Sequence, residues 1–172
     1  HAGCPVPGRT FAVALLYALM TSSTPLMTLS VRRQASSTTT RSPLPPGAVY
    51  AASVSSEGTV GLYRIEISTA GGKGKLKMAG GVKGAMKESI KRAYNYLRSN
   101  KAGFGLERAI DVTDMHVEAI DLLGNEVEGE VGVAFFVAAF SALKKEPPQP
   151  ALLVLGDMSI QGNIKQARSL VE

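Results

Sequence analysis

The sequence predicts one mixed α+β domain that begins near Leu44. Three observations predict this fold class. Residues 59–67 alternate between apolar and polar side chains, which is the period of a half-buried strand. Residues 82–100 carry apolar side chains at steps of three and four, which is the period of an amphipathic helix. Residues 131–143 are apolar on nearly all sides, which is typical of a helix buried in a core.

The length and charge of the chain indicate one ordinary domain that follows a different N-terminal segment. The 172 residues carry a net charge of +5. No Asp or Glu occurs before Glu57, whereas four arginines do: Arg9, Arg32, Arg33 and Arg41. From Glu57 onward, 15 Lys and Arg face 14 Asp and Glu. Because this part is close to neutral, its overall charge does not predict DNA binding.

Cysteine and histidine are too scarce for several kinds of site. Cys4 is the only cysteine, which excludes an internal disulfide and a cysteine-based metal site. His1 and His116 are the only histidines, and a lone His116 is more typical of a structural residue than of a ligand. We therefore expect no metal and no cofactor in this chain, and a reduced, cytoplasmic location.

Residues 1–43 form an atypical leader. They are rich in Ser, Thr, Pro and Arg, and contain one apolar run at residues 11–20. That run after Arg9 resembles a signal peptide without an A-x-A cleavage pattern, and the composition also suits an organelle transit peptide. A third interpretation is a stretch that is not a selected protein sequence, such as an out-of-frame read. The run is too short to span a membrane, for which about 20 residues are needed.

The first strands of the domain follow a breaker cluster at residues 43–47 (PLPPG). Residues 48–54 and 59–67 are predicted to be two strands joined by a turn containing Gly58. In the second strand, one face is formed by Tyr63, Ile65 and Ile67. Residues 75–78 are predicted to be a short third strand.

The glycine-rich connection at residues 71–74 (GGKG) has some features of a phosphate-binding loop. It lacks the G-x-x-x-x-G-K-[ST] spacing and does not lead directly into a helix. We therefore interpret it as a tight turn between strands, with phosphate binding as the minor alternative.

The helix predicted at residues 82–100 presents a basic face. This face consists of Lys83, Lys87, Lys91, Arg92 and Arg98, of which Lys83, Lys87, Lys91 and Arg98 are the candidate nucleic-acid contacts. A solvated surface is the commoner meaning of such a pattern, and contact with nucleic-acid phosphates is the alternative.

The second half of the domain is predicted to continue with a strand at residues 115–120 and a loop at residues 124–129. The apolar helix at 131–143 follows and ends before Pro147 and Pro148. We then expect a buried strand at residues 151–155 and a turn between two short extended pieces at residues 160–164. A further helix is expected to start at Gln166.

Three glutamates precede the apolar helix. Glu126, Glu128 and Glu130 could together bind Mg²⁺ or act as an acid/base pair. The simpler interpretation is that acidic side chains near a helix N-terminus are favoured by its dipole.

Several motifs resemble the proteolytic domain of the Lon proteases. Residues 74–80 (GKLKMAG) and 86–90 (MKESI) are similar to its first strand and helix, and 114–117 (DMHV) to its D-I-H-V-H strand. Residues 141–143 (SAL) and 156–162 (GDMSIQG) resemble a helix end and a G-E-I-[ST]-L-R-G turn. The resemblance implies a Lon-like fold over residues 44–172. This fold would be truncated at its C-terminus, because the family's domain continues further.

Other segments are similar to the Lon-like proteins of BREX phage-defence systems. They are residues 44–47 (LPPG), 61–64 (GLYR), 79–82 (AGGV) and 131–136 (VGVAFF). This resemblance implies a larger AAA+ protein that assembles into homo-oligomeric rings, with ATP and Mg²⁺ bound by an upstream domain. It also implies contact with DNA or other defence proteins, and no contact with a membrane.

The catalytic dyad of the family has no counterpart at the matching positions. Lon peptidases use a serine that is activated by a neutral lysine. Alignment through residues 141–143 places Glu130 at the serine position, or Val131 after a shift of one residue. Alignment through Gly162 places Val171 at the lysine position. We therefore expect a non-proteolytic domain, with an ATP-dependent serine peptidase as the alternative and a substitute dyad of Ser159 and Lys165 as a remote one.

Overall fold

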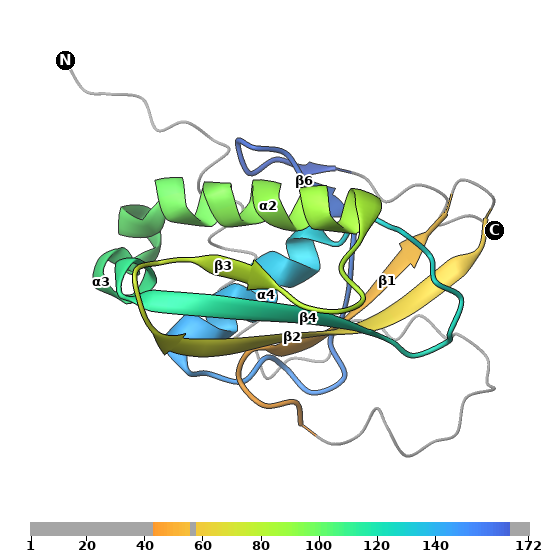
Figure 1. Cartoon of the computed structure of the whole chain (residues 1–172), viewed down its shortest axis with the longest axis horizontal. Coiled ribbons are helices and arrows are strands. Elements are labelled where there is room, and N and C mark those ends of the chain that lie inside the picture. The colour runs from red at the N-terminus through yellow and green to blue at the C-terminus, as the bar shows by residue number, and fades with distance from the viewer. Residues whose placement is uncertain (1–42, 56–57, 166–172) are drawn as a thin grey trace.

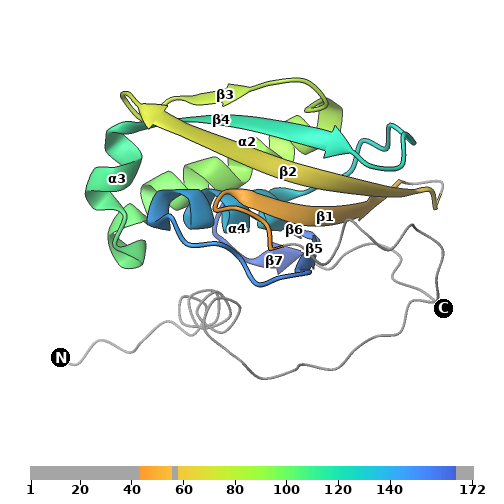
Figure 2. The same cartoon turned by 90° about the horizontal axis from the view of Figure 1, so that it is seen from below.

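A five-stranded sheet forms the framework of the domain in the computed structural model, which describes residues 43–55 and 58–165 (Figures 1 and 2). The strands follow the order β3-β4-β2-β1-β5. The two central pairs, β4–β2 and β2–β1, are antiparallel, whereas the outer pairs β3–β4 and β1–β5 are parallel. The strand bounds are β1 Ala48–Val54, β2 Val60–Gly71, β3 Leu76–Met78, β4 Thr113–Asp121 and β5 Leu153–Leu155. This arrangement confirms the predicted mixed α+β class.

The alternation that predicted β2 reflects its position over the core. Tyr63, Ile65 and Ile67 are all buried on one face of the strand. The strand runs four residues beyond the predicted end at Ile67, because its backbone continues to pair with β4 as far as Gly71 and Thr113. These last residues are exposed, so they show no hydrophobic pattern from which the longer strand could have been predicted.

Two helices, α2 (Gly84–Ser99) and α4 (Gly132–Lys144), pack against each other, and α4 lies on β1 and β2 (Figure 1). The apolar stripe of α2 is buried, with Ile90, Ala93 and Leu97 fully inaccessible. As predicted, α4 is buried on nearly all sides. The main core therefore lies between the helices and one face of the sheet, and Leu44, Ala48 and Tyr50 form a small separate cluster.

A short 3₁₀ helix, η1 (Lys101–Phe104), and a short helix, α3 (Glu107–Asp111), connect α2 to β4. Neither was predicted, because each spans about one turn and shows too few residues for a period. Phe104 fixes this connection through an edge-on ring contact with Phe136 of α4 at 5.4 Å between centroids.

The chain then forms a hairpin of two short strands, β6 (Asp157–Met158) and β7 (Ile164–Lys165). This confirms the predicted turn between two extended pieces. The predicted leader at residues 1–43 and the helix predicted from Gln166 lie almost entirely outside the described residues. Within the described residues, no helix has the length and apolar character that a membrane span requires.

Candidate functional site

The loop before α4 carries Glu130 and is held in place by Ser89 of α2. The Ser89 hydroxyl is fully buried, donates a hydrogen bond to the carbonyl of Met86 at 2.8 Å and accepts one from the amide of Val131 at 3.1 Å. Since Val131 is the residue that precedes the first turn of α4, this hydroxyl fixes the start of the helix relative to α2. The backbone around Glu130 is therefore positioned by the core rather than by solvent.

Glu130 belongs to an ion-pair group that we call the Arg92 cluster, which consists of Arg92, Glu130, Asp157 and Lys165. Arg92 Nη2 lies 2.9 Å from Glu130 Oε1 and 2.7 Å from Asp157 Oδ2. Lys165 Nζ lies 2.9 Å from Asp157 Oδ2 and 3.9 Å from Glu130 Oε1. The cluster thus joins α2, the loop before α4 and the β6–β7 hairpin at one point.

Asp157 is the buried member of the Arg92 cluster. Its side chain is only 2% exposed, whereas that of Glu130 is 41% exposed. Burial opposes ionisation of Asp157, but hydrogen bonds from Lys165 and Arg92 outweigh burial and lower its pKa. The carboxylate also lies against the first turn of α4, where the helix dipole favours a negative charge.

Gly132 explains how Asp157 approaches α4 so closely. A Cβ atom at Gly132 would lie 2.3 Å from Asp157 Oδ1, which is far below a normal contact. Oδ1 is buried and has no hydrogen-bond partner among the described residues. The first turn of α4 therefore accommodates this carboxylate only because residue 132 has no side chain.

The motifs of the sequence placed the family lysine position at Val171 and offered Lys165 only as a remote partner of Ser159. Val171, the position that matches the family lysine, lies outside the described residues. Ser159 does not form a dyad with Lys165 in the described structure: its hydroxyl accepts hydrogen bonds from the amides of Gln161 and Asn163 at 3.3 and 3.1 Å. Lys165 instead reaches Asp157 and the side chain of Glu130, which alignment through residues 141–143 predicts at the serine position.

The three glutamates before α4 point to different partners. Glu130 pairs with Arg92, whereas Glu128 lies against Gly84 in the first turn of α2, where an added Cβ would lie 1.8 Å from its Oε2. Glu126 lines a separate pocket. No group of three or more His, Cys, Asp or Glu among residues 43–55 and 58–165 is arranged to hold a metal ion. The helix-dipole interpretation therefore describes Glu128, although the helix concerned is α2 rather than α4.

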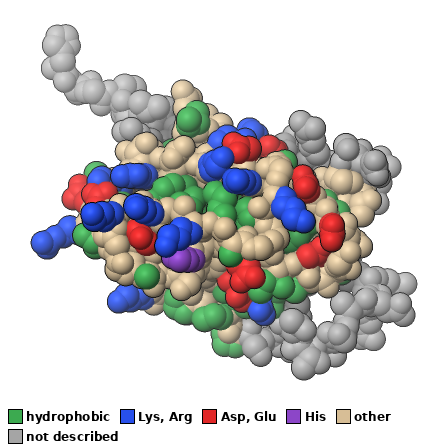
Figure 3. All heavy atoms as spheres, viewed as in Figure 1, with side chains coloured by type: hydrophobic (Ala, Val, Ile, Leu, Met, Phe, Trp, Pro, Cys, Tyr) green, Lys and Arg blue, Asp and Glu red, His purple; other side chains and the backbone are tan. Residues whose placement is uncertain are grey.

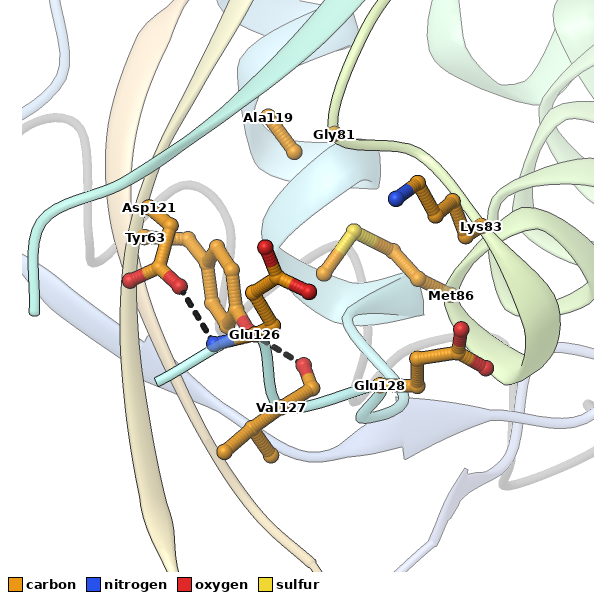
Figure 4. A pocket seen from close by; sticks show the side chains of 9 residues that line it. All are labelled: Tyr63, Gly81, Lys83, Met86, Ala119, Asp121, Glu126, Val127 and Glu128. Carbon is orange, nitrogen blue, oxygen red and sulfur yellow. Dashed lines mark hydrogen bonds between the residues drawn. The ribbon is translucent and has the colours of Figure 1, made fainter. Parts of the chain in front are cut away.

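The pocket that Glu126 lines has a volume of about 280 Å³ and lies between the start of α2 and the loop after β4 (Figure 4). Its lining residues are Tyr63, Gly81, Lys83, Met86, Ala119, Asp121, Glu126, Val127 and Glu128. The Tyr63 hydroxyl donates a hydrogen bond to the carbonyl of Val127. Burial, together with the charges of Asp121, Glu126 and Glu128, raises the pKa of Tyr63 to about 12. The pocket is thus a second polar site. Its lining residue Glu128 lies two positions before Glu130 of the Arg92 cluster in the sequence.

The predicted basic residues of α2 are exposed and lie along one stripe. Lys83, Lys87, Lys91 and Arg98 follow one another at steps of four, four and seven residues, so they share one side of the helix. Lys91 pairs with Glu88 at 2.8 Å, and Lys83 also lines the pocket. Figure 3 shows Lys and Arg side chains spread over this face together with acidic ones.

The glycine-rich connection at residues 71–74 binds a carboxylate of the chain itself. Asp114 Oδ1 accepts hydrogen bonds from the amides of Lys73 and Lys75, each at 2.8 Å. These amides would be the donors of a phosphate-binding loop, and here they hold β3 to the start of β4. The interpretation as a structural turn is therefore the better one. His116 lies exposed on β4, beside Lys77 of β3.

The sequence did not identify Asp157 as a site residue, and it offered Arg92 only as part of the basic face of the helix and Lys165 only as a partner of Ser159. Arg92 lies 38 positions before Glu130, and Asp157 lies 65 positions after Arg92. The sequence offered only a weak signal for this ion-pair group: Arg92 is on the polar side of an amphipathic helix, and Asp157 follows a predicted buried strand. Such residues are brought together only by the packing of α2, α4 and the hairpin.

Comparison with known proteins identifies the family. The model of the Lon protease (S16) C-terminal proteolytic domain matches residues 30–170. The chain is 29% identical over 126 residues to the Lon-like protease BrxL of Bacillus cereus (strain H3081.97), which covers 73% of the chain and 19% of that protein. It is 27% identical to the Lon-like protease BrxL of Escherichia coli O9:H4 (strain HS), over 73% of the chain and 18% of that protein.

A Lon protease of Mesomycoplasma hyopneumoniae (strain 232) is 28% identical over 109 residues, which are 63% of the chain and 12% of that protein. The chain thus spans less than a fifth of the length of these relatives. With a sheet and helices consistent with this fold and a family match over most of its length, the chain belongs to the Lon protease (S16) C-terminal proteolytic domain family.

Proposed function

We propose that this chain is the Lon-like domain of a larger AAA+ phage-defence protein, and that it serves assembly or contact with DNA or partner proteins without cutting peptides. One observation carries the absence of cleavage. Glu130, which stands at the position of the family's serine, is paired with Arg92 and lies 3.9 Å from Lys165. A charged carboxylate held in this way does not replace a serine hydroxyl that must lose its proton and attack a carbonyl.

Lys165 supports the same proposal. A lysine that activates serine must be neutral, because only the neutral amine accepts the proton. Lys165 Nζ is instead engaged in an ion pair with the buried carboxylate of Asp157, at 2.9 Å. Loss of the serine nucleophile in a well-studied hydrolase costs on the order of 10⁶ in turnover. The two changes together argue against hydrolysis by the family mechanism.

The similarity to the two BrxL proteins supports the AAA+ phage-defence context. In this proposal ATP and Mg²⁺ bind to another part of the complete protein, which forms a homo-oligomeric ring in the cytoplasm. The exposed stripe of Lys83, Lys87, Lys91 and Arg98 is then the surface of this domain that contacts DNA phosphates.

A serine-directed fluorophosphonate probe tests the absence of cleavage. We expect no labelling of this chain under conditions in which an active Lon protease is labelled, and no hydrolysis of casein. A Glu130→Ser variant restores a hydroxyl at the nucleophile position. We expect it to remain unlabelled as well, because Lys165 is still paired with Asp157.

Labelling of the unmodified chain at any serine would overturn the non-proteolytic proposal and favour a serine peptidase. Labelling of the Glu130→Ser variant alone would leave that proposal in place. It would show that Lys165 can act as the base once a hydroxyl is present, so that the missing nucleophile is the only defect.

A further inference from the structure

The face of the sheet that points away from α2 and α4 is apolar at one end. The strand registers place alternate side chains of β5, β1 and β2 on this face, in rows such as Leu155, Ala52 and Leu62. Leu122, the residue after β4, extends this row, because its amide donates a hydrogen bond to the carbonyl of Leu62 at 2.8 Å. With the neighbouring rows they form what we call the outer apolar patch, which consists of Val60, Leu62, Ile120, Leu122, Leu153 and Leu155.

The outer apolar patch departs from the alternation that a half-buried sheet normally shows. Antiparallel sheets that face water on one side carry polar residues there, as this sheet does further along, where Glu66 lies opposite Glu118. In the patch, by contrast, Val60, Leu122 and Leu153 are 50%, 37% and 46% exposed. A contiguous exposed apolar surface of this kind marks an interaction site. We therefore expect the patch to be covered by another apolar surface.

The size of the outer apolar patch argues against a second copy of the chain as its cover. Neighbouring strands lie about 4.8 Å apart, and side chains on one face repeat about every 6.8 Å along a strand. The patch extends over β5, β1, β2 and the end of β4, which gives roughly 20 Å by 20 Å, or about 400 Å², with the side chains included. Two copies packed face to face would bury about 800 Å² in total, whereas stable interfaces bury about 1,200–2,000 Å². A segment of the same chain needs less area, because its effective concentration is about millimolar.

The chain reaches β1 along this same face. Leu44 is 8% exposed and forms a small cluster with Ala48 and Tyr50, which point to the outer face of β1. Tyr50 is in turn the neighbour of Leu153 in the outer apolar patch. The sequence before Leu44 contains one apolar run, residues 11–20 (FAVALLYALM), which the 22 residues 21–42 connect to Pro43. A connection of that length spans up to about 70 Å, so the run can reach every part of the patch.

We propose that residues 11–20 of the chain bind the outer apolar patch and shield it from solvent. The run carries no charged residue, so no charge loses its hydration when the run covers the patch. Apolar surface on both sides is removed from water, which is the driving force of the contact. The proposal requires neither catalysis nor DNA, so it stands or falls independently of the proposed function.

A photocrosslinker in the apolar run locates the surface that it binds. Tyr17 in the complete chain is replaced by p-benzoylphenylalanine, which keeps an aromatic ring and reacts on irradiation with neighbouring C–H bonds. We expect the main product to be a crosslink within one chain to a peptide of β1, β2 or β5, as identified by mass spectrometry. A main product that joins two chains, or one that joins the run to α2, would overturn the proposal.

Two matched double variants test whether the patch is responsible for the crosslink. We expect Leu122→Ser/Leu153→Ser to lower the crosslink yield at least about fivefold, because it removes apolar side chains from both sides of the patch. Ile160→Ser/Ile164→Ser is the control, since these residues are 66% and 53% exposed but belong to the β6–β7 hairpin region outside the patch. Circular dichroism checks that both variants are folded, and equal yields in the two would contradict the proposal.

The sign of a dye response separates a bound run from a free one. Leu15→Asp/Leu19→Asp makes the run polar in the complete chain. If the run covers the outer apolar patch, this variant releases it, and we expect the fluorescence of the hydrophobic dye bis-ANS to rise about twofold or more. If the run is free, the variant only removes apolar side chains that would bind the dye. A fall in fluorescence, or no change, would therefore overturn the proposal.

Discussion

Asp157 is the residue whose ionisation ties the Arg92 cluster to pH. Because its pKa in the folded chain is lowered, it contributes stability that is present above its unfolded pKa, about 3.9, and is lost as the pH falls through the folded value. We expect the free energy of unfolding to fall below about pH 4, and this acid-dependent loss to be smaller in Asp157→Asn. Urea unfolding between pH 7 and pH 2.5, followed by circular dichroism, measures both slopes.

Asp157→Asn is also expected to lower the free energy of unfolding at neutral pH. Asp157 is buried and binds two cations, so Asp157→Asn removes the buried carboxylate that Arg92 and Lys165 share and leaves them only the more exposed Glu130. Since both cations are partly exposed, we expect the free energy of unfolding to fall by about 2 kcal/mol, which is less than the full penalty for breaking a buried ion pair. The lowered pKa of Asp114 and that of Asp121 account for the acid dependence that remains. An unchanged acid slope in Asp157→Asn would contradict this account.

At the scale of elements, the first turn of α4 is restricted by what packs against it. Gly132→Ala would ordinarily favour a helix by about 1 kcal/mol, but here the new Cβ meets Asp157 Oδ1. We expect this variant to be destabilised by about 1–3 kcal/mol, as for overpacking in a core. Gly103→Ala is the control, since a Cβ at Gly103 meets nothing within 4 Å. Thermal unfolding of the two variants compares them, and equal melting temperatures would contradict the expected clash.

The elements were predictable where one face of each is buried over several turns or pleats. α2 and α4 were found because their apolar residues recur over 16 and 13 residues, and β1 was predicted with the bounds that it has. η1 and α3 were missed because four and five residues carry no period. The assignment of Glu130 to the serine position stays a prediction from its motif. Its pairing with Arg92 and Lys165 was not predicted, because their approach to it depends on tertiary packing that no local pattern records.

At the scale of the whole molecule, the charge from Glu57 onward is nearly balanced, so any DNA contact must depend on local charge. We expect weak DNA binding. A plot of the logarithm of the binding constant against the logarithm of the salt concentration should become less steep in Lys87→Gln/Lys91→Gln/Arg98→Gln. The slope should decrease in magnitude by up to about three, or about one for each lost phosphate contact. Arg108→Gln/Lys144→Gln/Lys145→Gln removes equal charge elsewhere and serves as the control. Filter binding over a salt series measures the slopes, and equal slopes would exclude the stripe as the DNA surface.

The parallel pairing of β1 with β5 imposes an order on biosynthesis. β1 ends at Val54, and its partner β5 begins at Leu153, about 100 residues later. At a translation rate of about 5–20 residues per second, the edge of β1 waits roughly 5–20 s for that partner after it has left the ribosome. An unpaired edge strand is a template for pairing with other chains. The nascent chain therefore passes through an interval in which this edge is open to pairing with other chains, and codons that slow translation between β1 and β5 would lengthen that interval.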